Sequence, residues 1–109
     1  MVKVEEIKNY DEYKSFVESN SEMLHVIKIG AEWCAPCNQL SNTIKSLDES
    51  KIGTTMFAEI DIEDDVDEIV SMYGVRSVPV TIFIKNNEIL DKKIGSITAD
   101  IIYNNIEQF

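Results

Sequence analysis

Apolar residues recur along the chain with two alternating periods, and each change of period marks a boundary between a predicted strand and a predicted helix. Strand periodicity and β-branched composition predict five strands, over Val2–Val4, Leu24–Ala31, Thr55–Ile62, Val80–Ile84 and Ile89–Ile94. Apolar residues at helical spacing predict four helices, over residues 9–19, 34–50, 63–73 and 98–109. The order of elements is therefore βαβαβαββα.

Local signals support several of these boundaries. Asn9 is a typical cap for the first helix, and Gly74 is a typical helix stop. The acidic run Glu63–Glu68 is interpreted as the solvated start of the third helix. Asn86-Asn87 suits a tight hairpin turn between the last two strands. In the last helix the apolar spacing predicts one inward face, made of Ile101, Ile102, Ile106 and Phe109.

Strands that alternate with helices predict an α/β fold in which helical crossovers join parallel strands. The final hairpin adds an antiparallel pair, so we expect a mixed central sheet with helices on both faces. A chain of 109 residues is long enough for one core and too short for two. We therefore expect one domain over residues 1–109.

The balance of charge limits the partners. There are 10 basic and 20 acidic residues, a net charge of −10, whereas nucleic-acid binding needs a basic surface. No apolar run approaches the length that spans a membrane. The segment Met1–Tyr10 is charged and lacks the apolar stretch of a secretory signal. We expect a cytoplasmic protein that binds neither nucleic acid nor membrane.

The chemistry of the chain is concentrated in its only two cysteines, which lie in the segment Trp33-Cys34-Ala35-Pro36-Cys37. Cys34 stands at the predicted start of a helix, where unpaired N–H groups stabilise a thiolate. Cys37 lies one turn further along and is expected to be more buried. Pro36 is tolerated there because the first helical N–H groups have no partner. This spacing predicts dithiol–disulfide exchange, with Cys34 as nucleophile and Cys37 as the resolving thiol.

Three other interpretations of the pair are less well supported. A zinc site needs about four ligands, and His25 is the only histidine in the chain. A purely structural disulfide is rare in the expected compartment, and an inert core position suits Cys37 better than Cys34. The glycines are dispersed, so no phosphate-binding loop is predicted and no cofactor beyond the cysteine pair itself.

Three segments resemble the thioredoxin family. Ala31–Cys37 resembles its active-site motif, usually Trp-Cys-Gly-Pro-Cys, Tyr73–Pro79 resembles a second signature, and Lys93-Ile94-Gly95 resembles a third. The resemblance covers essentially the whole chain. It implies a thioredoxin-like three-layer sandwich and a monomeric protein-disulfide reductase. Its substrates would be disulfide-containing proteins, and its electrons would come from an NADPH-dependent thioredoxin reductase.

The resemblance also implies roles for the residues around the cysteines. Pro79 should follow a cis peptide bond and lie against Cys34, so that the backbone of Val78 can pair with an extended substrate segment. Gly95 would let that segment approach. The apolar rim of this docking surface would consist of Trp33, Ala35, Pro36, Val75 and Val78.

The chain departs from the family pattern in the strand before the motif. Lys28 stands where thioredoxins bury an aspartate, and Glu59 stands where the family often has a lysine. A lone buried ammonium is costly, so we predict that Lys28 and Glu59 contact each other behind Cys37. The alternative is that Lys28 extends to the surface and leaves Glu59 solvated. If the pair forms, Lys28 would favour the Cys37 thiolate and Glu59 could relay a proton through water.

Two further departures concern small residues. Ala35 replaces the usual glycine between the cysteines, which narrows the freedom of the backbone there. Gly30 replaces an aromatic residue beneath the active-site loop, which predicts a loop that is looser or packed by another side chain.

Two alternative functions remain open at this point. One is a disulfide oxidase or isomerase, which differs from a reductase in reduction potential. The other is a non-catalytic subunit that uses the surface around Trp33 to bind a partner protein. Replacing both cysteines with serine would abolish the activity of an enzyme and spare that of a subunit.

Overall fold

The structure, a computed structural model, describes all residues from Met1 to Phe109. The chain forms the predicted order of strands and helices, with one additional 3-10 turn, η1. In chain order the elements are β1 (Val4–Asn9), α1 (Tyr10–Glu18), β2 (His25–Gly30), α2 (Ala35–Lys45), η1 (Glu49–Lys51), β3 (Met56–Asp65), α3 (Asp67–Met72), β4 (Val80–Lys85), β5 (Glu88–Ile94) and α4 (Ala99–Gln108).

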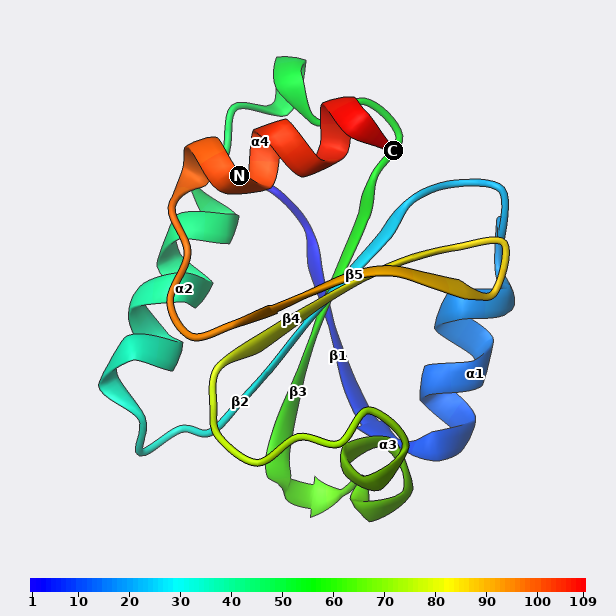
Figure 1. Ribbon diagram of the computed structural model, residues 1–109, viewed down its shortest axis with the longest axis vertical. Helices are drawn as coiled ribbons and strands as arrows, with labels where there is room; N and C mark the ends of the chain where they lie inside the picture. The colour runs from blue at the N-terminus through cyan, green and yellow to red at the C-terminus, as the bar shows by residue number, and fades with distance from the viewer.

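The five strands form one mixed sheet in the order β1-β3-β2-β4-β5. β3 pairs in parallel with both β1 and β2, and β4 is antiparallel to both β2 and β5. The expectation that every helical crossover joins parallel strands was therefore wrong for α3. This short helix stays at the end of the sheet where β3 finishes, so β4 starts at that end and runs back (Figure 1).

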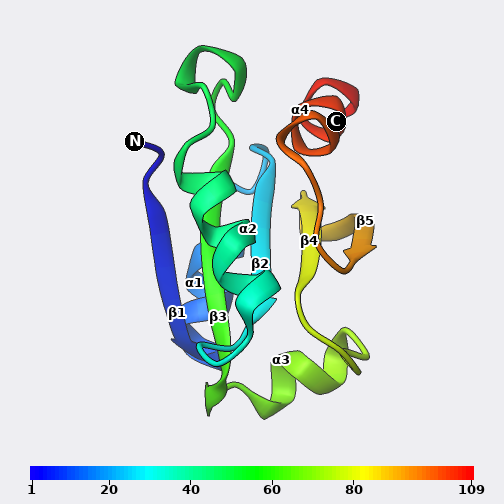
Figure 2. The same ribbon diagram turned by 90° about the vertical axis from the view of Figure 1, so that its left-hand side faces the viewer.

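Helices cover both faces of the sheet, as predicted. α1 and α3 pack on one face and α2 and α4 on the other (Figure 1), and Figure 2 looks onto the face that carries α2. Residues alternate between the two faces along each strand, so Ile27 and Ile29 belong to the α1 core whereas Val26 belongs to the α2 core. By the same alternation, Lys28 and Gly30 face α2. No helix is both long enough and apolar enough to cross a membrane.

Two strands differ from their predicted bounds because pairing extends them. β1 begins at Val4 and continues to Asn9, rather than covering Val2–Val4, because it pairs with β3 along this length. β3 runs to Asp65, which is opposite Asn9 in β1. Most of the acidic run therefore lies on a strand, and only Asp67 and Glu68 occupy the first turn of α3.

The helices α2 and α4 also differ from the prediction. α2 ends at Lys45, not Ser50, and is followed by the separate turn η1. In α4, Ile101 was expected to point inward but is 37% exposed, whereas Asn105 is buried at 6%. Asn105 is buried because its side-chain amide donates a hydrogen bond to Asp91 Oδ2 at 2.8 Å, joining α4 to β5.

Two local signals are confirmed. The side chain of Asn9 accepts a hydrogen bond from the backbone N–H of Glu12 at 2.9 Å and caps α1. Asn86 and Asn87 adopt φ values of 54° and 61° in the hairpin turn, where the mirror-image turn requires this left-handed backbone.

The contact between Asp91 and Asn105 predicts a pH dependence of stability. Partial burial raises the pKa of Asp91, but hydrogen bonds from Asn105 and from Lys92 N–H, together with Lys93, outweigh it and hold that pKa below its ordinary value. A depressed folded-state pKa stabilises the fold above the unfolded pKa of about 3.9, and this contribution is lost as pH falls through the folded pKa. The parent should therefore have a higher free energy of unfolding than Asp91→Asn, by an amount that is constant above about pH 5 and decreases as the pH is lowered further. Urea unfolding at a series of pH values measures it, and a constant difference down to about pH 2 would contradict it.

Candidate active site

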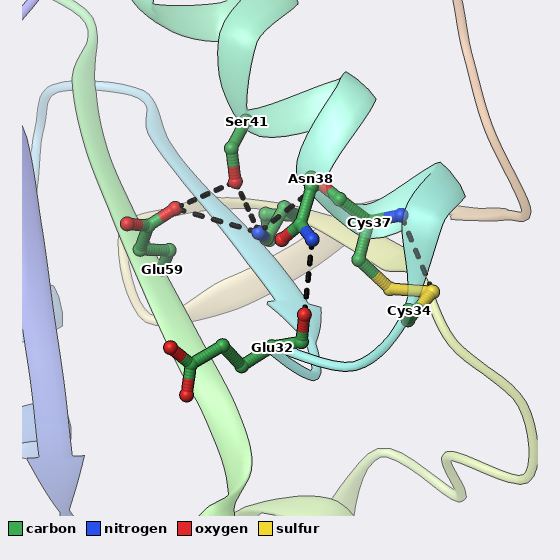
Figure 3. Close-up of a disulfide and its surroundings, with 7 residues drawn as sticks. Glu32, Cys34, Cys37, Asn38, Ser41 and Glu59 are labelled. Atoms are coloured by element: carbon green, nitrogen blue, oxygen red, sulfur yellow. Dashed lines mark hydrogen bonds and ion pairs between the residues drawn. A yellow bond between two sulfur atoms is a disulfide. The ribbon is translucent and has the colours of Figure 1, made fainter.

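The two cysteines lie where β2 passes into α2. β2 ends at Gly30, and Cys34 is the N-cap of α2, with an extended backbone at φ −98° and ψ 109°. The Cys34 sulfur accepts a hydrogen bond from the backbone N–H of Cys37 at 3.2 Å. The side-chain amide of Asn38 donates to the carbonyl oxygen of Glu32 at 2.9 Å, which ties the loop to the first turn of the helix (Figure 3). Pro36 lies in that first turn, as predicted.

The cysteines form a disulfide with their Cα atoms 5.2 Å apart, within the range that a disulfide needs. Cys37 is fully buried, as expected, at 0% exposure. Cys34 is more covered than its loop position indicated: it is 7% exposed, because Ala31 and the half-buried Ile62 and Val78 pack around the pair. A partner can therefore reach only a small edge of the outer cysteine.

The predicted docking residues surround this edge. Trp33 is 67% exposed, and Ala35 and Pro36 are also exposed. The Val78-Pro79 peptide bond is cis, as the resemblance implied, and Val78 packs against the cysteine cluster.

Gly95 lies beside Pro79. Its N–H donates to the carbonyl oxygen of Pro79 at 2.8 Å, and its φ of 88° is a left-handed conformation that favours glycine. Val75, predicted in the apolar rim, packs partly against the α1 core.

The sequence did not predict two features of this surface, the contact of Trp33 with Glu63 and the exposure of Ile94. The indole N–H of Trp33 donates to Glu63 Oε1 at 2.9 Å. Glu63 was assigned to a helix start, so nothing in the pattern linked it to Trp33. Ile94, next to Gly95 in the chain, is exposed at 68%.

The predicted contact between Lys28 and Glu59 is confirmed. The two residues are register partners on the parallel strands β2 and β3, and Lys28 Nζ lies 3.4 Å from Glu59 Oε2. The Lys28 side chain is only 7% exposed and that of Glu59 is 22% exposed, so the alternative in which Lys28 reaches the surface was wrong. Lys28 Nζ also donates to the carbonyl oxygen of Cys37 at 3.4 Å, which puts the ammonium directly behind the inner cysteine.

Two further side chains join this pair. The Ser41 hydroxyl accepts a hydrogen bond from Lys28 Nζ and donates one to Glu59 Oε2 at 2.9 Å (Figure 3). Lys45 Nζ lies 4.0 Å from the other carboxylate oxygen of Glu59. Both Ser41 and Lys45 come from α2, and their helical spacing alone did not distinguish them from exposed polar positions.

A cleft of about 530 Å³ opens beside this group of side chains. Its lining includes Lys28, Ser41, Lys45 and Glu59 and also Asn38 from the start of α2. The cleft gives solvent a route to the side chains behind Cys37, although Cys37 itself does not line it.

Gly30 explains how Cys37 fits against the sheet. A Cβ atom added to Gly30 would lie 3.0 Å from Cys37 Cβ and 3.1 Å from Cys37 Sγ. The space left by the expected aromatic residue is therefore filled by Cys37 itself, and the loop is packed rather than loose.

Gly30→Ala should consequently destabilise the oxidised protein by about 1–3 kcal/mol, the usual cost of overpacking a core. Urea unfolding of the oxidised protein measures this change. Glu32→Ala, at an exposed position of the same loop, is the control and should stay within about 0.5 kcal/mol of the parent. If Gly30→Ala were as stable as the parent, Cys37 would be able to shift away from the added methyl group at no cost in the free energy of unfolding.

His25, the residue considered as a zinc ligand, lies at the other end of β2 from the cysteines. Its ring nitrogens lie 2.9 Å from the carbonyl oxygen of Met23 and 3.0 Å from that of Ser19. Its side chain therefore connects the start of β2 to the segment that follows α1. No group of three or more His, Cys, Asp or Glu side chains is arranged to hold a metal ion.

Comparisons with known proteins agree with this geometry. The family model described as Thioredoxin matches residues 4–108. Thioredoxin H5 of Oryza sativa subsp. japonica is 34% identical over 94 residues, which cover 86% of this chain and 67% of the rice protein. Thioredoxin-1 of Drosophila melanogaster is 29% identical over 90 residues, 83% of each protein. The crystal structure of reduced Schistosoma mansoni thioredoxin pre-protein has a TM-score of 0.85 at 24% identity, with 98% of each chain covered, which confirms the predicted fold.

Proposed function

Because the chain belongs to the thioredoxin family and bonds its two cysteines to each other, it is a thiol–disulfide oxidoreductase, and we propose a role for each residue of its site. The substrates of such a protein-disulfide reductase are proteins that contain disulfides. The observation that carries the proposal is the asymmetry of the pair, with Cys34 at the edge of an exposed surface and Cys37 sealed behind it.

The first step is attack by the Cys34 thiolate on one sulfur of the substrate disulfide. The substrate S–S bond breaks, a bond forms between Cys34 and one substrate sulfur, and the other substrate sulfur leaves and takes a proton. The start of α2 supports this role, because the Cys37 N–H already points at the Cys34 sulfur at 3.2 Å. That hydrogen bond and the helix N-terminus stabilise the negative charge on a thiolate.

The second step is attack by the Cys37 thiolate on the Cys34 sulfur. The mixed disulfide breaks, the second substrate sulfur leaves as a thiolate and takes a proton, and the Cys34–Cys37 disulfide forms. The protein loses the two electrons that the substrate gains. The structure represents the product of this step, in which the two cysteines are joined.

We propose that substrates dock on the exposed surface around Cys34. An extended segment would pair with the backbone of Val78 and pass over Gly95, which has no side chain to block it. Trp33, Ala35 and Pro36 would supply apolar contacts on the other side of the disulfide. The exposed Ile94, next to Gly95, would extend this apolar rim.

We propose that Lys28 and Glu59, which lie behind the disulfide, help Cys37 to lose its proton. The Lys28 ammonium would favour the thiolate of Cys37 by direct electrostatic attraction. Glu59 is more exposed than Lys28 and faces the cleft, so it is suited to exchange a proton with water. Pro79 and Val78 are assigned to substrate binding rather than to this exchange.

A reductase must be returned to its dithiol form after each turnover. We propose that an NADPH-dependent thioredoxin reductase supplies the electrons and that the protein works as a monomer in a reducing compartment such as the cytoplasm. Chemistry supports the choice of compartment, because a dithiol at equilibrium with its surroundings stays reduced only where the reduction potential of the compartment is low enough. One chain also carries both cysteines that the reaction requires.

Turnover of a disulfide-bonded protein tests the function directly. With dithiothreitol as electron source, the parent should accelerate reduction, and a variant with Cys34→Ser and Cys37→Ser should add nothing to the dithiothreitol rate. Equal rates for the parent and the double variant would refute the reductase and favour a partner-binding subunit.

A further inference from the structure

The hydroxyl of Ser41 occupies the centre of the side-chain group behind the disulfide. It accepts a hydrogen bond from Lys28 Nζ and donates its own hydrogen to Glu59 Oε2. A protonated lysine can only donate and a carboxylate can only accept, so the direction of both hydrogen bonds is fixed. Ser41 therefore bridges a buried cation and its counter-charge, beside their direct contact of 3.4 Å.

Ser41 also connects the cation to the helix that carries Cys37. Residues four apart on a helix lie on the same face, and Cys37 and Ser41 are so spaced on α2. Of the acceptors around Lys28 Nζ, the carbonyl oxygen of Cys37 and the Ser41 hydroxyl belong to α2, whereas the Glu59 carboxylate belongs to β3. A long, flexible side chain such as that of Lys28 needs such anchors to hold its charge in one place.

Without Ser41, the attraction of Glu59 would dominate the position of the ammonium. Glu59 lies on the cleft and also attracts Lys45, 4.0 Å away. The charged groups that face this region come from several elements and the active-site loop: Glu6 and Lys8 of β1, Lys28 of β2, Glu32 of the loop, Lys45 of α2, and Glu59, Asp61 and Asp64 of β3. Among them, Lys28 is the one that contacts Cys37.

We propose that Ser41 is a positioning residue of the exchange reaction: its hydroxyl holds the Lys28 ammonium against α2, where the positive charge favours the thiolate of Cys37. The step that depends on it is the second one, in which Cys37 loses its proton and attacks the Cys34 sulfur. Ser41 contacts neither sulfur nor substrate and acts only through Lys28. This inference rests on the proposed function of Cys37 as the resolving thiol.

The test compares the parent with Ser41→Ala and Ser41→Thr, with Thr43→Ala as the matched control. Thr43 is on the same helix, and its hydroxyl bonds only the Gln39 carbonyl oxygen. In a Cys34→Ser background, the ultraviolet absorbance of the thiolate reports the pH at which Cys37 loses its proton. Ser41→Ala should raise that pH by about one unit, Ser41→Thr should restore it, and Thr43→Ala should leave it unchanged.

A kinetic measurement separates the two steps. When the reduced protein reacts with a chromogenic disulfide, attack by Cys34 releases one thiol and attack by Cys37 releases the second. Ser41→Ala should slow the second release about tenfold at neutral pH, in proportion to the lost thiolate, and leave the first release unchanged. A general loss of folding would slow both phases together.

A double-mutant cycle shows whether Ser41 acts through Lys28. In a Lys28→Met background there is no charge to position, so Ser41→Ala should cause no further shift in the titration of Cys37. An equal shift in both backgrounds, or no shift in the Lys28-containing protein, would overturn the proposal. If the parent itself releases no second thiol, the proposed function fails instead, and the two failures are distinguishable.

Discussion

Replacing Cys37 with serine is expected to stop the reaction at the mixed disulfide between Cys34 and its substrate. The variant keeps the outer thiol and the helix start that activates it, so the first step continues. The second step has no attacking sulfur, and catalytic turnover should fall by at least about a thousandfold. Mass spectrometry without reducing agent should detect a covalent one-to-one adduct with a disulfide-bonded protein.

Cys34→Ser provides the matched comparison, because it removes one sulfur from the same motif. It should lose turnover equally and form no adduct, since Cys37 is fully buried and cannot meet a protein substrate. An adduct on Cys37, or parental turnover by Cys37→Ser, would reverse the assignment of nucleophile and resolving thiol.

The second large effect is expected on stability, at the buried charge pair. Glu59→Gln leaves the Lys28 ammonium, 7% exposed, with hydrogen-bond acceptors but no contacting counter-charge. Breaking a buried pair in this way costs about 3–5 kcal/mol. Lys28→Met should cost less, because Glu59 is 22% exposed and keeps Lys45 and the water of the cleft.

Urea unfolding of both variants measures this asymmetry. Exchanging the two charges, with Lys28→Glu and Glu59→Lys together, should be less destabilising than the sum of the single charge changes, because the pair is restored. Lys45→Met is the control and should change stability by less than about 1 kcal/mol, as an exposed pair does. A Glu59→Gln variant within about 0.5 kcal/mol of the parent would mean that the pair does not stabilise the fold.

The sequence predicted the parts of the site that depend on local spacing within an element and on positions that the family pattern aligns. Cys34 and Cys37 are separated by one helical turn, so their joint position at the start of α2 followed from the motif. The apolar residues on either side of Lys28 in its strand favoured its burial, and the resemblance aligned Glu59 with the neighbouring strand, which predicted their contact. Both predictions describe relations within an element or between positions that the family pattern already aligned.

The sequence did not predict features that depend on tertiary contacts between different helices and strands. The direction of β4 depends on where α3 packs, and nothing in the spacing of its apolar residues reports that. Ile101 fits the apolar pattern of α4, yet Asn105 takes the buried position because Asp91 of β5 offers it a partner. Ser41 resembles any polar residue of an amphipathic helix, and only the tertiary structure shows that Lys28 and Glu59 meet at its hydroxyl.

The reduction potential of the Cys34–Cys37 pair, measured by equilibration in graded thiol buffers, tests the central claim most directly. As a protein-disulfide reductase, the chain should have a potential close to the reference value of thioredoxin, about −270 mV. A potential near about −120 mV, the range of a strong disulfide oxidant, would contradict the account.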